Sequence, residues 1–524
     1  MSSELKPALR NDDYAPLVPR PSDWKWAIWY YILVAFGCVV YLYFNLFASH
    51  GVPILQSGDQ VYFWMGAQQL LNGQVIYRDF FQYTPPGTDL IFAAFFRFLG
   101  ITIGATNIVV MVFGVIFGCV CFSISRKLMK PELAALTTGL FMVLIYGKVL
   151  TATNHWFAAI FVLLAVRVSM ERANTERIAA SGALLALAAF FNQAHGGAAL
   201  IGFSAFLLCR NVRARQTAAE TIKLVALLLM SFTLMLLLLN AYYIVTVGIE
   251  RLWYCLVLYV FKYLTHYTPP ALGLPTLALT TRAIPGLAPY LAVYILVPIV
   301  YGIALWQCWR SRKRDSFPWN QVALLALVGS SLLLEVAVSI TWLRLFAVSL
   351  PAVVLAIWAI GALPALRRPM VVALWIALSV VAIRQIAVKR AFNSVQIELP
   401  GGRCTTTTEA YGKLHWLAEH THRGDFLFQA GWPGVYIPLQ LRNPIYMPTL
   451  ARWDTLRSQD IASSIQQIQA KRVRYVLWKQ TLDEGCEFSA CQDQLSPFRA
   501  YLKSSYTLVQ VFADGDTVWE KLDD

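Results

Sequence analysis

Charged residues are scarce in this chain. Asp, Glu, Lys and Arg make up 14% of its 524 residues, whereas soluble proteins carry about 25%. Acidic residues are the scarcer kind, at 29 against 43 basic ones, while 58% of the chain is hydrophobic. This composition excludes an ordinary soluble protein and predicts an integral membrane protein.

Glycine-rich phosphate loops are also missing. No stretch matches GxxxxGK followed by Ser or Thr, and none makes a convincing GxGxxG, the patterns that cradle nucleotide phosphates. No set of His, Cys, Asp and Glu stands at a recognisable metal-ligand spacing. We therefore assign no cofactor, and leave a divalent metal open. The net charge of +14 does not predict nucleic-acid binding, because basic residues of membrane proteins gather in cytoplasmic loops.

The nine cysteines divide into two groups. Three lie in the hydrophilic C-terminal part, where Cys486 and Cys491 could close a small disulfide loop in an oxidising compartment while Cys404 is left over. The other six lie in or beside apolar stretches, where a thiol behaves as a small hydrophobic group, and receive no chemical role: Cys38, Cys119, Cys121, Cys209, Cys255 and Cys308.

Long apolar runs dominate the rest of the chain. A helix that crosses a bilayer needs about 20 mostly apolar residues. The polar residues 1–26 precede the first run without a small-residue cleavage site, so we expect an uncleaved anchor. We predict a polytopic α-helical protein with about eleven transmembrane helices, near residues 27–48, 103–124, 133–149, 155–170, 178–192, 196–209, 222–247, 288–308, 320–340, 343–363 and 369–388.

Basic residues set the predicted orientation. The loops SRKLMK, RVSMERANTER, RNVRARQ, WRSRKR and LRRP fall on one side of this arrangement, which the positive-inside rule makes cytoplasmic. A hairpin at Asn192–Gly197 is needed to keep this register. The N-terminus is then cytoplasmic and the C-terminus outside, and three larger segments face outward: 49–102, 248–287 and 389–524.

The last outward segment has the pattern of a folded α/β domain. DFLFQA, VRYVLWK and TLVQVF are short β-type runs, and LRSQDIASSIQQIQAK is typical of a helix. We predict a transmembrane module over residues 1–388 and an extracytoplasmic α/β domain over residues 389–524.

The first outward loop carries unusual polarity for its place. Residues 60–71 predict an amphipathic helix at the membrane interface, and Asp59 stands where an N-cap carboxylate would accept backbone N–H bonds. NGQVIYRDFF indicates a turn. Pro85 and Pro86 make a rigid corner, after which TDLIFAAFFRFLG predicts a second interfacial helix. This loop predicts a platform, in which Asp59 is either a cap or a catalytic group.

These residues resemble the GT-C superfamily of polytopic glycosyltransferases. The closest branch contains protein O-mannosyltransferases, lipid A aminoarabinose transferases and rhizobial galacturonosyltransferases. A second stretch, TWLRLFAVSLPAVVLA, is similar to the late span of that family, with Arg344 and Pro351 in the matching places. The first-loop pattern is matched by Asp59, Gly73, Tyr77, Arg78, Asp79, Pro85 and Pro86.

The chain also departs from the family pattern. Aminoarabinose transferases carry a Lys just before the Pro pair, where this chain has Thr84. Several relatives place an acidic residue in the second outward loop, whereas GKVLTATNHW has none. Asn154 and His155 are the polar residues there, so a second acidic group at the site stays an open question.

The resemblance implies an inverting transfer of a monosaccharide from a polyprenyl-phosphate carrier to an envelope hydroxyl. The acceptor would be a glycolipid, polysaccharide or protein at the outer face of a membrane, for which we expect the bacterial inner membrane. Asp59 would be the base. Candidate contacts to the lipid phosphate are Arg78, Asp79, Tyr83, Lys148, Arg251, Lys262, Arg282 and Arg344, with Asn154 and His155 as further polar contacts.

Each candidate also has a structural interpretation. Arg344 could form an ion pair with Glu335, and Arg251 and Lys262 could be interfacial anchors. Two histidines at outward span ends, His155 and His195, are interpreted as polar loop residues. Three C-terminal residues could contact acceptor sugars or could belong to a packed core: Trp432, Tyr436 and Arg442. A transporter or flippase of lipid-linked sugars is the alternative function, and an inactive scaffold of the same fold a third.

Overall fold

The computed structural model describes residues 24–171, 174–264, 284–314, 317–338, 342–361, 364–450, 457–483 and 493–522. Three of the residues discussed above, Arg282, Cys486 and Cys491, lie outside these ranges. Helices occupy all eleven predicted ranges: α1 (Trp24–Leu46), α4 (Ile103–Ser125), α5 (Pro131–Leu140), α6 (Asn154–Ser169), α7 (Thr175–Phe191), α8 (Gln193–Arg213), α9 (Ala218–Val247), α11 (Ile284–Arg310), α12 (Trp319–Val338), α13 (Trp342–Val348), α14 (Leu350–Gly361) and α15 (Pro364–Phe392).

Six helical segments of the described chain are long and apolar enough to cross a membrane. Two of them, in α9 and α15, bury little of their surface and therefore present long apolar faces to the surroundings. The protein is thus an integral membrane protein, while the full count of eleven spans stays a prediction. The six segments are Ile28–Leu46, Ile103–Ser125, Pro131–Val149, Ala218–Val247, Trp319–Val336 and Pro369–Phe392.

The predicted hairpin between α7 and α8 is present, but it is tighter than the sequence suggests. Asn192 alone breaks the helix, with an extended backbone at φ −148° and ψ 108°, and α8 begins at the next residue. The Asn192 side chain caps α8 by accepting the backbone N–H of His195 at 3.1 Å. Gly196 lies against the Ala189 backbone, where a Cβ would clash. A helix hairpin this close needs the glycine.

The predicted span at 343–363 is wrong in one respect, because it is two helices and not one. α13 ends at Val348 and α14 begins at Leu350. Pro351 has no N–H to continue the hydrogen-bond ladder from α13. At the same break, the Val348 carbonyl accepts the hydroxyl of Tyr301 at 3.0 Å. The break separates the segment carrying Arg344 from the apolar helix that follows.

The first outward loop contains two helices, α2 (Gln60–Leu71) and α3 (Gly87–Leu99). The helix predictions are confirmed, but the interfacial character of α2 is wrong. Nine of its residues are buried, Gln68 and Gln69 included, because α2 packs against α3 and the helical body and also contacts the C-terminal region through α17. By contrast, α3 buries Phe92 and Phe96 and exposes Phe98, as an interfacial helix would.

The C-terminal region is a small α/β unit, as predicted. Its four-stranded sheet has the order β3-β4-β6-β5, with β3 parallel to β4 and the other pairs antiparallel. The three predicted strands and the predicted helix are found as β3 (Leu427–Gln429), β4 (Tyr475–Trp478), β5 (Tyr506–Val511) and α18 (Ser458–Ala470). The other elements are β1 (Val395–Ile397), β2 (Cys404–Thr406), β6 (Thr517–Lys521), α16 (Thr408–His420), α17 (Tyr436–Leu439) and α19 (Ser496–Ser505).

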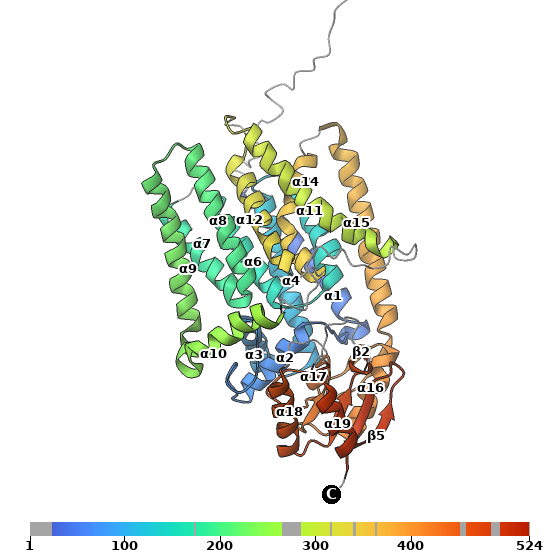
Figure 1. Cartoon of the computed structure of the whole chain (residues 1–524). Coiled ribbons are helices and arrows are strands. Elements are labelled where there is room, and N and C mark those ends of the chain that lie inside the picture. Colours follow the sequence, from blue (N-terminus) through green and yellow to red (C-terminus); the bar gives the residue numbers. More distant parts are fainter. Residues whose placement is uncertain are drawn as a thin grey trace, which may run out of the picture.

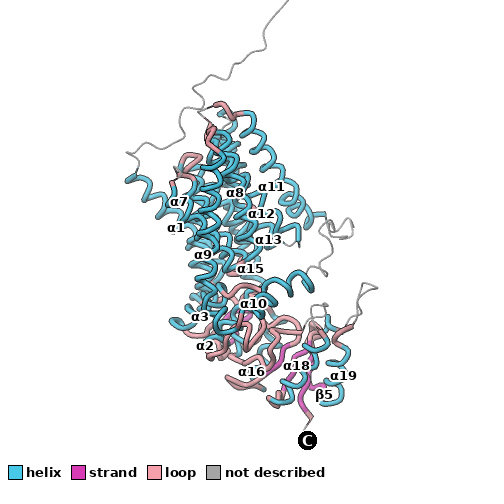
Figure 2. Tube along the Cα trace, turned by 60° about the vertical axis from the view of Figure 1, so that its left-hand side comes forward, coloured by secondary structure: helices cyan, strands magenta, loops and turns pink. Residues whose placement is uncertain are grey.

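The first loop lies between the helical body and this α/β unit (Figure 1). Backbone bonds join the loop to the unit: Leu55 donates to Thr405 at 2.8 Å, Thr405 to Pro53 at 2.9 Å, and Phe81 to Tyr446 at 2.8 Å. Figure 2, turned by 60°, shows the strands at the same end of the molecule, beyond α2 and α3. The loop is therefore a middle layer, fixed from both sides.

Candidate active site

Asp59 is the last residue before α2. It takes the N-cap position, but its backbone is helical and its side chain makes no capping bond. The side chain is exposed, and none of the hydrogen bonds or ion pairs found among the described residues involves its carboxylate. The Asp59 carboxylate is therefore not used to cap α2, and it is available to a ligand.

Neighbouring residues hold Asp59 against the second outward loop. Gln60 donates from Nε2 to the Ser57 carbonyl at 3.0 Å and accepts the Ala152 N–H on Oε1 at 3.1 Å. Gly58 adopts a φ of +90°, which favours glycine, and packs beside Thr151. These contacts fasten the chain around Asp59 to the residues that lead into α6.

Two basic side chains and two phenols lie within electrostatic range of Asp59. Displacement of water by the surrounding protein raises the pKa of Asp59 although its surface is open, while His155 and Arg344 act in the opposite direction. Loss of hydration, with a further contribution from Asp59, raises the pKa of Tyr83 to about 12, and the same causes raise the pKa of Tyr62. These five groups form the candidate active site.

A buried polar cluster stands behind His155. Each carboxylate oxygen of Glu335, on α12, is hydrogen-bonded to one imidazole. Oε1 lies 2.9 Å from His155 Nδ1, and Oε2 lies 2.6 Å from His195 Nδ1. Asn192 Nδ2 lies 3.3 Å from Glu335 Oε1. All four side chains are buried. The interpretation of the two histidines as polar loop residues is therefore wrong, because helix packing carries both into the interior.

Glu335 was the only member of this cluster with an obvious sequence signal, as an acid inside an apolar run. Glu335 pairs with the two histidines. The charge of Arg344, on α13, acts on Asp59 and Tyr83. The second acidic group of the region thus comes from α12 and not from the second outward loop.

Arg78 and Asp79 are occupied with each other at the surface. Their side chains form two hydrogen bonds of 3.0 and 2.9 Å, and Asp79 also accepts the Val75 N–H at 2.7 Å. The bonds from Arg78 lower the pKa of Asp79. Both residues therefore stabilise the turn that follows α2.

Arg251, on α10 (Ile249–Trp253), joins three parts of the chain. Its Nε donates to the Tyr77 carbonyl and its Nη2 to the Tyr446 hydroxyl, both at 2.8 Å. Tyr446 donates to the same Tyr77 carbonyl at 2.8 Å. Tyr77 needs this support, since its φ is +71°, a conformation that non-glycine residues seldom adopt.

The remaining candidates take different positions. Lys148, on η5 (Tyr146–Val149), and Lys262, on η7 (Val260–Leu264), are exposed. Asn154 is buried in the first turn of α6. Thr84, which replaces the Lys of some relatives, has a buried hydroxyl with no hydrogen-bond partner among the described residues.

The three C-terminal candidates differ in burial and in the contacts that they make. Tyr436 is fully buried and its hydroxyl bonds the β3 backbone, so it belongs to the core. Arg442 donates to the Gly424 carbonyl at 2.6 Å. Trp432 is 37% exposed and meets Tyr62 edge-on, with ring centroids 5.1 Å apart. Trp432 is thus the candidate that reaches the site.

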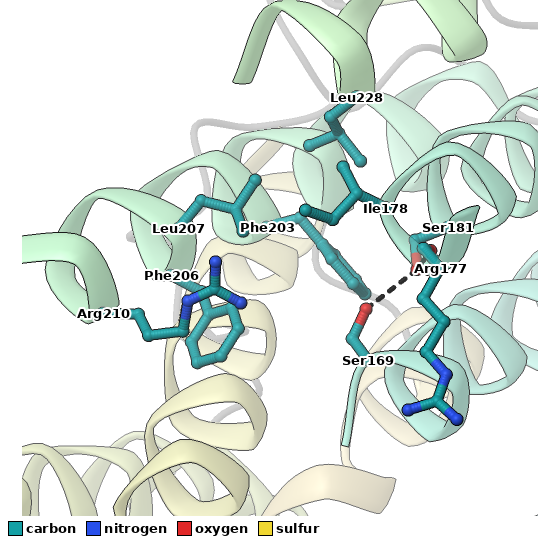
Figure 3. Close-up of a pocket in the computed structure, with 9 residues that line it drawn as sticks. All are labelled: Ser169, Arg177, Ile178, Ser181, Phe203, Phe206, Leu207, Arg210 and Leu228. Atoms are coloured by element: carbon teal, nitrogen blue, oxygen red, sulfur yellow. Dashed lines mark hydrogen bonds between the residues drawn. The ribbon is translucent and has the colours of Figure 1, made fainter. Parts of the chain in front are cut away.

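A cavity elsewhere in the helical body is not part of this site. Figure 3 shows Arg177 and Arg210 among its lining, with the hydroxyls of Ser169 and Ser181 bonded at 2.8 Å. Its residues lie toward the ends of α7 and α8 remote from Asn192, about 20 Å away at 1.5 Å per helical residue. Within the described ranges, no group of three or more His, Cys, Asp or Glu is arranged to hold a metal ion.

Comparison with known proteins shows the fold. No family model and no curated protein sequence matches the chain. Among solved structures, ArnT from Cupriavidus metallidurans in its apo state matches with a TM-score of 0.56 and 11% identity, over 96% of this chain and 98% of that one. The same protein bound to undecaprenyl phosphate matches with a TM-score of 0.51 and 10% identity, over 95% and 98%.

A second solved structure shares this architecture. The Archaeoglobus fulgidus oligosaccharyltransferase tethered with an acceptor peptide matches with a TM-score of 0.50 and 11% identity, over 96% of this chain and 75% of that one. Matches at this identity establish the architecture. The chain has a GT-C-type fold, and the resemblance found in the sequence is confirmed at that level.

Proposed function

We propose that this chain is a glycosyltransferase that moves a monosaccharide from a polyprenyl-phosphate carrier to a hydroxyl of a cell-envelope acceptor. The observation that carries the proposal is Asp59, an exposed carboxylate with no hydrogen bond among the described residues and with the charges of His155 and Arg344 acting on it. Its fold is that of ArnT, which has been solved with undecaprenyl phosphate bound.

Asp59 would act as the general base. It accepts the proton of the acceptor hydroxyl while that oxygen forms a bond to the anomeric carbon of the sugar. The bond from that carbon to the phosphate oxygen breaks on the opposite side, and polyprenyl phosphate leaves with the electron pair. The sugar configuration therefore inverts. A pKa raised by desolvation suits a base that works near neutral pH.

Arg344 and Tyr83 would stabilise the leaving phosphate. A guanidinium binds phosphate oxygens through two parallel hydrogen bonds, and Tyr83, with a pKa of about 12, keeps its proton at neutral pH and can donate it in a hydrogen bond. Lys148 is a further candidate, because η5 packs against α13. We assign Arg78, Asp79 and Arg251 to the architecture of the loop, since their donors and acceptors are already engaged.

The acceptor would enter from the side of the α/β unit. Trp432 is partly exposed and contacts Tyr62 of α2, so it can offer an aromatic face to a sugar. We place this unit outside the membrane with the N-terminus in the cytoplasm, on the basis of the basic loops, and propose a bacterial inner membrane. The acceptor is a glycolipid, polysaccharide or protein.

Reconstitution distinguishes this function from transport. The protein in vesicles is given polyprenyl-phosphate sugars and envelope acceptors, and both sugar transfer and movement of the labelled lipid between leaflets are followed. We expect transfer that requires Asp59 and inverts the anomeric centre. Lipid movement without transfer would instead establish the flippase alternative, and transfer that is unaffected by Asp59→Asn would overturn the assignment of the base.

A further inference from the structure

The buried cluster behind the candidate site contains three ionisable groups, Glu335, His155 and His195. Glu335 is 4% exposed and lies between two imidazoles. An ionised carboxylate in such a place needs a positive partner, because an unpaired buried charge is strongly unfavourable. At least one of His155 and His195 must therefore be an imidazolium if Glu335 is ionised.

With Glu335 ionised, its hydrogen bonds indicate which ring nitrogen of His155 carries a proton. Asn192 Oδ1 accepts the backbone N–H of His195. Asn192 Nδ2 is therefore the atom that faces Glu335 Oε1 at 3.3 Å and His155 Nδ1 at 3.0 Å. Asn192 Nδ2 is a donor, and Glu335 Oε1 is the acceptor available to it. His155 Nδ1 lies 2.9 Å from that oxygen, so it carries a proton and donates to Glu335.

The two histidines differ in their surroundings. His155 is bonded to Glu335 and is within electrostatic range of Asp59, whereas the ring of His195 is bonded to Glu335 alone among the described residues. His195 Nε2 is buried without a hydrogen-bond partner, and a charged N–H in that position would cost more than a neutral lone pair. The positive charge therefore favours His155.

We propose that Glu335, assisted by His195 and Asn192, holds His155 as an imidazolium that faces Asp59 and keeps Asp59 ionised for catalysis. Glu335 is then a positioning residue that acts through His155. This inference rests on the proposed function for its catalytic consequence, but the charge on His155 is a property of the protein without substrate. The other groups in electrostatic contact with Asp59 are Arg344 on α13, Tyr62 on α2 and Tyr83 before α3.

Two variants with the same chemical change separate this role from a general effect of removing a buried acid. Glu335→Gln removes the carboxylate that stabilises the imidazolium. Asp89→Asn removes another buried carboxyl, on α3, where Gln82 Nε2 lies 3.3 Å from it. Burial raises the pKa of Asp89 well above its usual range, so asparagine closely matches its neutral form. Asp89 is not among the charges that act on Asp59.

The first measurement is nitrogen NMR of protein with labelled histidine, in vesicles and without substrate. The chain has seven histidines, and loss of one signal in His155→Gln identifies His155. We expect both ring nitrogens of His155 to be protonated at neutral pH in the wild type and in Asp89→Asn, and only Nδ1 or Nε2 in Glu335→Gln. A neutral His155 in the wild type, or an imidazolium that persists in Glu335→Gln, would overturn the proposal.

The second measurement is the pH profile of sugar transfer. Without the imidazolium, Asp59 ionises at higher pH, so the acidic limb of kcat should move to higher pH in Glu335→Gln, with roughly tenfold slower transfer below it. The loss should diminish at alkaline pH, and KM for the lipid donor should change little. A uniform loss at every pH would assign Glu335 a structural role only.

The two measurements fail independently. If no donor and acceptor support transfer while the NMR result holds, the proposed function is wrong and the charge assignment stands. If Glu335→Gln does not fold, Glu335→Asp and His195→Asn test the same point, because the first keeps the carboxylate and the second removes only the accessory imidazole. Both should retain a charged His155, and a neutral His155 in either variant would contradict the proposal.

Discussion

Two aspartates of the motif in the first outward loop, Asp59 and Asp79, have opposite environments. Asp59, ahead of α2, makes no hydrogen bond among the described residues and has a raised pKa. Asp79, after α2, accepts bonds from Arg78 and from the Val75 N–H, and has a lowered pKa. Both belong to the motif that the family resemblance matches, yet only one is available for chemistry.

The difference shows that the two aspartates of this motif have different roles. Asp79 keeps the turn after α2 in shape, and Arg251 fixes the strained backbone of Tyr77 within it. Asp59 is held by its neighbours, through Gln60 and Gly58, and not by its own carboxylate. A motif match alone would treat the two aspartates alike, whereas their hydrogen bonds separate them.

The largest expected effect is on the rate of transfer. Asp59→Asn should lower kcat by about 10²- to 10⁴-fold, the usual contribution of a positioned general base. Asp79→Asn should leave kcat within severalfold of the wild type, because an amide oxygen still accepts the Val75 N–H. Steady-state transfer assays on both variants make the comparison. Equal losses of kcat in Asp59→Asn and Asp79→Asn would contradict the assignment of different roles to the two aspartates.

Arg344 comes next in size. Arg344→Met should lower kcat/KM by about 10²-fold, since one group that stabilises developing charge contributes on that scale, and Arg344→Lys should restore part of it. Arg78→Met is the matched control, because its guanidinium is already paired with Asp79. A larger loss in Arg78→Met than in Arg344→Met would move the phosphate site to the turn after α2.

The pH dependence should also distinguish the two aspartates. A raised folded-state pKa means that Asp59 holds its proton more tightly when folded, so transfer should fall as the pH drops through that raised value. For stability the sign is opposite, because ionisation of Asp59 becomes a cost as the pH rises. Asp59→Asn should therefore unfold no more readily than the wild type at neutral pH, as measured by thermal denaturation.

Asp79 should behave in the reverse way. Its folded-state pKa is lowered, so its contribution to stability is present above the ordinary pKa of an Asp and is lost as the pH falls through the lowered value. Asp79→Asn should thus reduce the unfolding temperature at neutral pH and lose this effect in acid. A destabilised Asp59→Asn together with an unaffected Asp79→Asn at neutral pH would contradict both assignments.

Periodicity and composition predict much of the helical body, because a bilayer imposes one length and one polarity on each helix. They do not predict tertiary burial. The buried state of α2 depends on packing against the helical body and against the α/β unit, which begins more than three hundred residues later in the chain. The link between Glu335 and the two histidines also joins three helices that are distant in sequence. Such contacts leave no local pattern.

The smallest predicted effect concerns Arg251, which links the turn after α2 to α10 and to the α/β unit. Arg251→Lys keeps the charge but loses the forked geometry that reaches the Tyr77 carbonyl and the Tyr446 hydroxyl together. One hydrogen bond of this kind contributes about 1 kcal/mol to stability, so the variant should unfold a few degrees earlier while keeping nearly full kcat. Lys262→Arg is the control on the same side of the molecule, since Lys262 is exposed. If Arg251→Lys instead abolished transfer without changing the unfolding temperature, Arg251 would contact substrate, and the phosphate site would include the turn that carries Asp79.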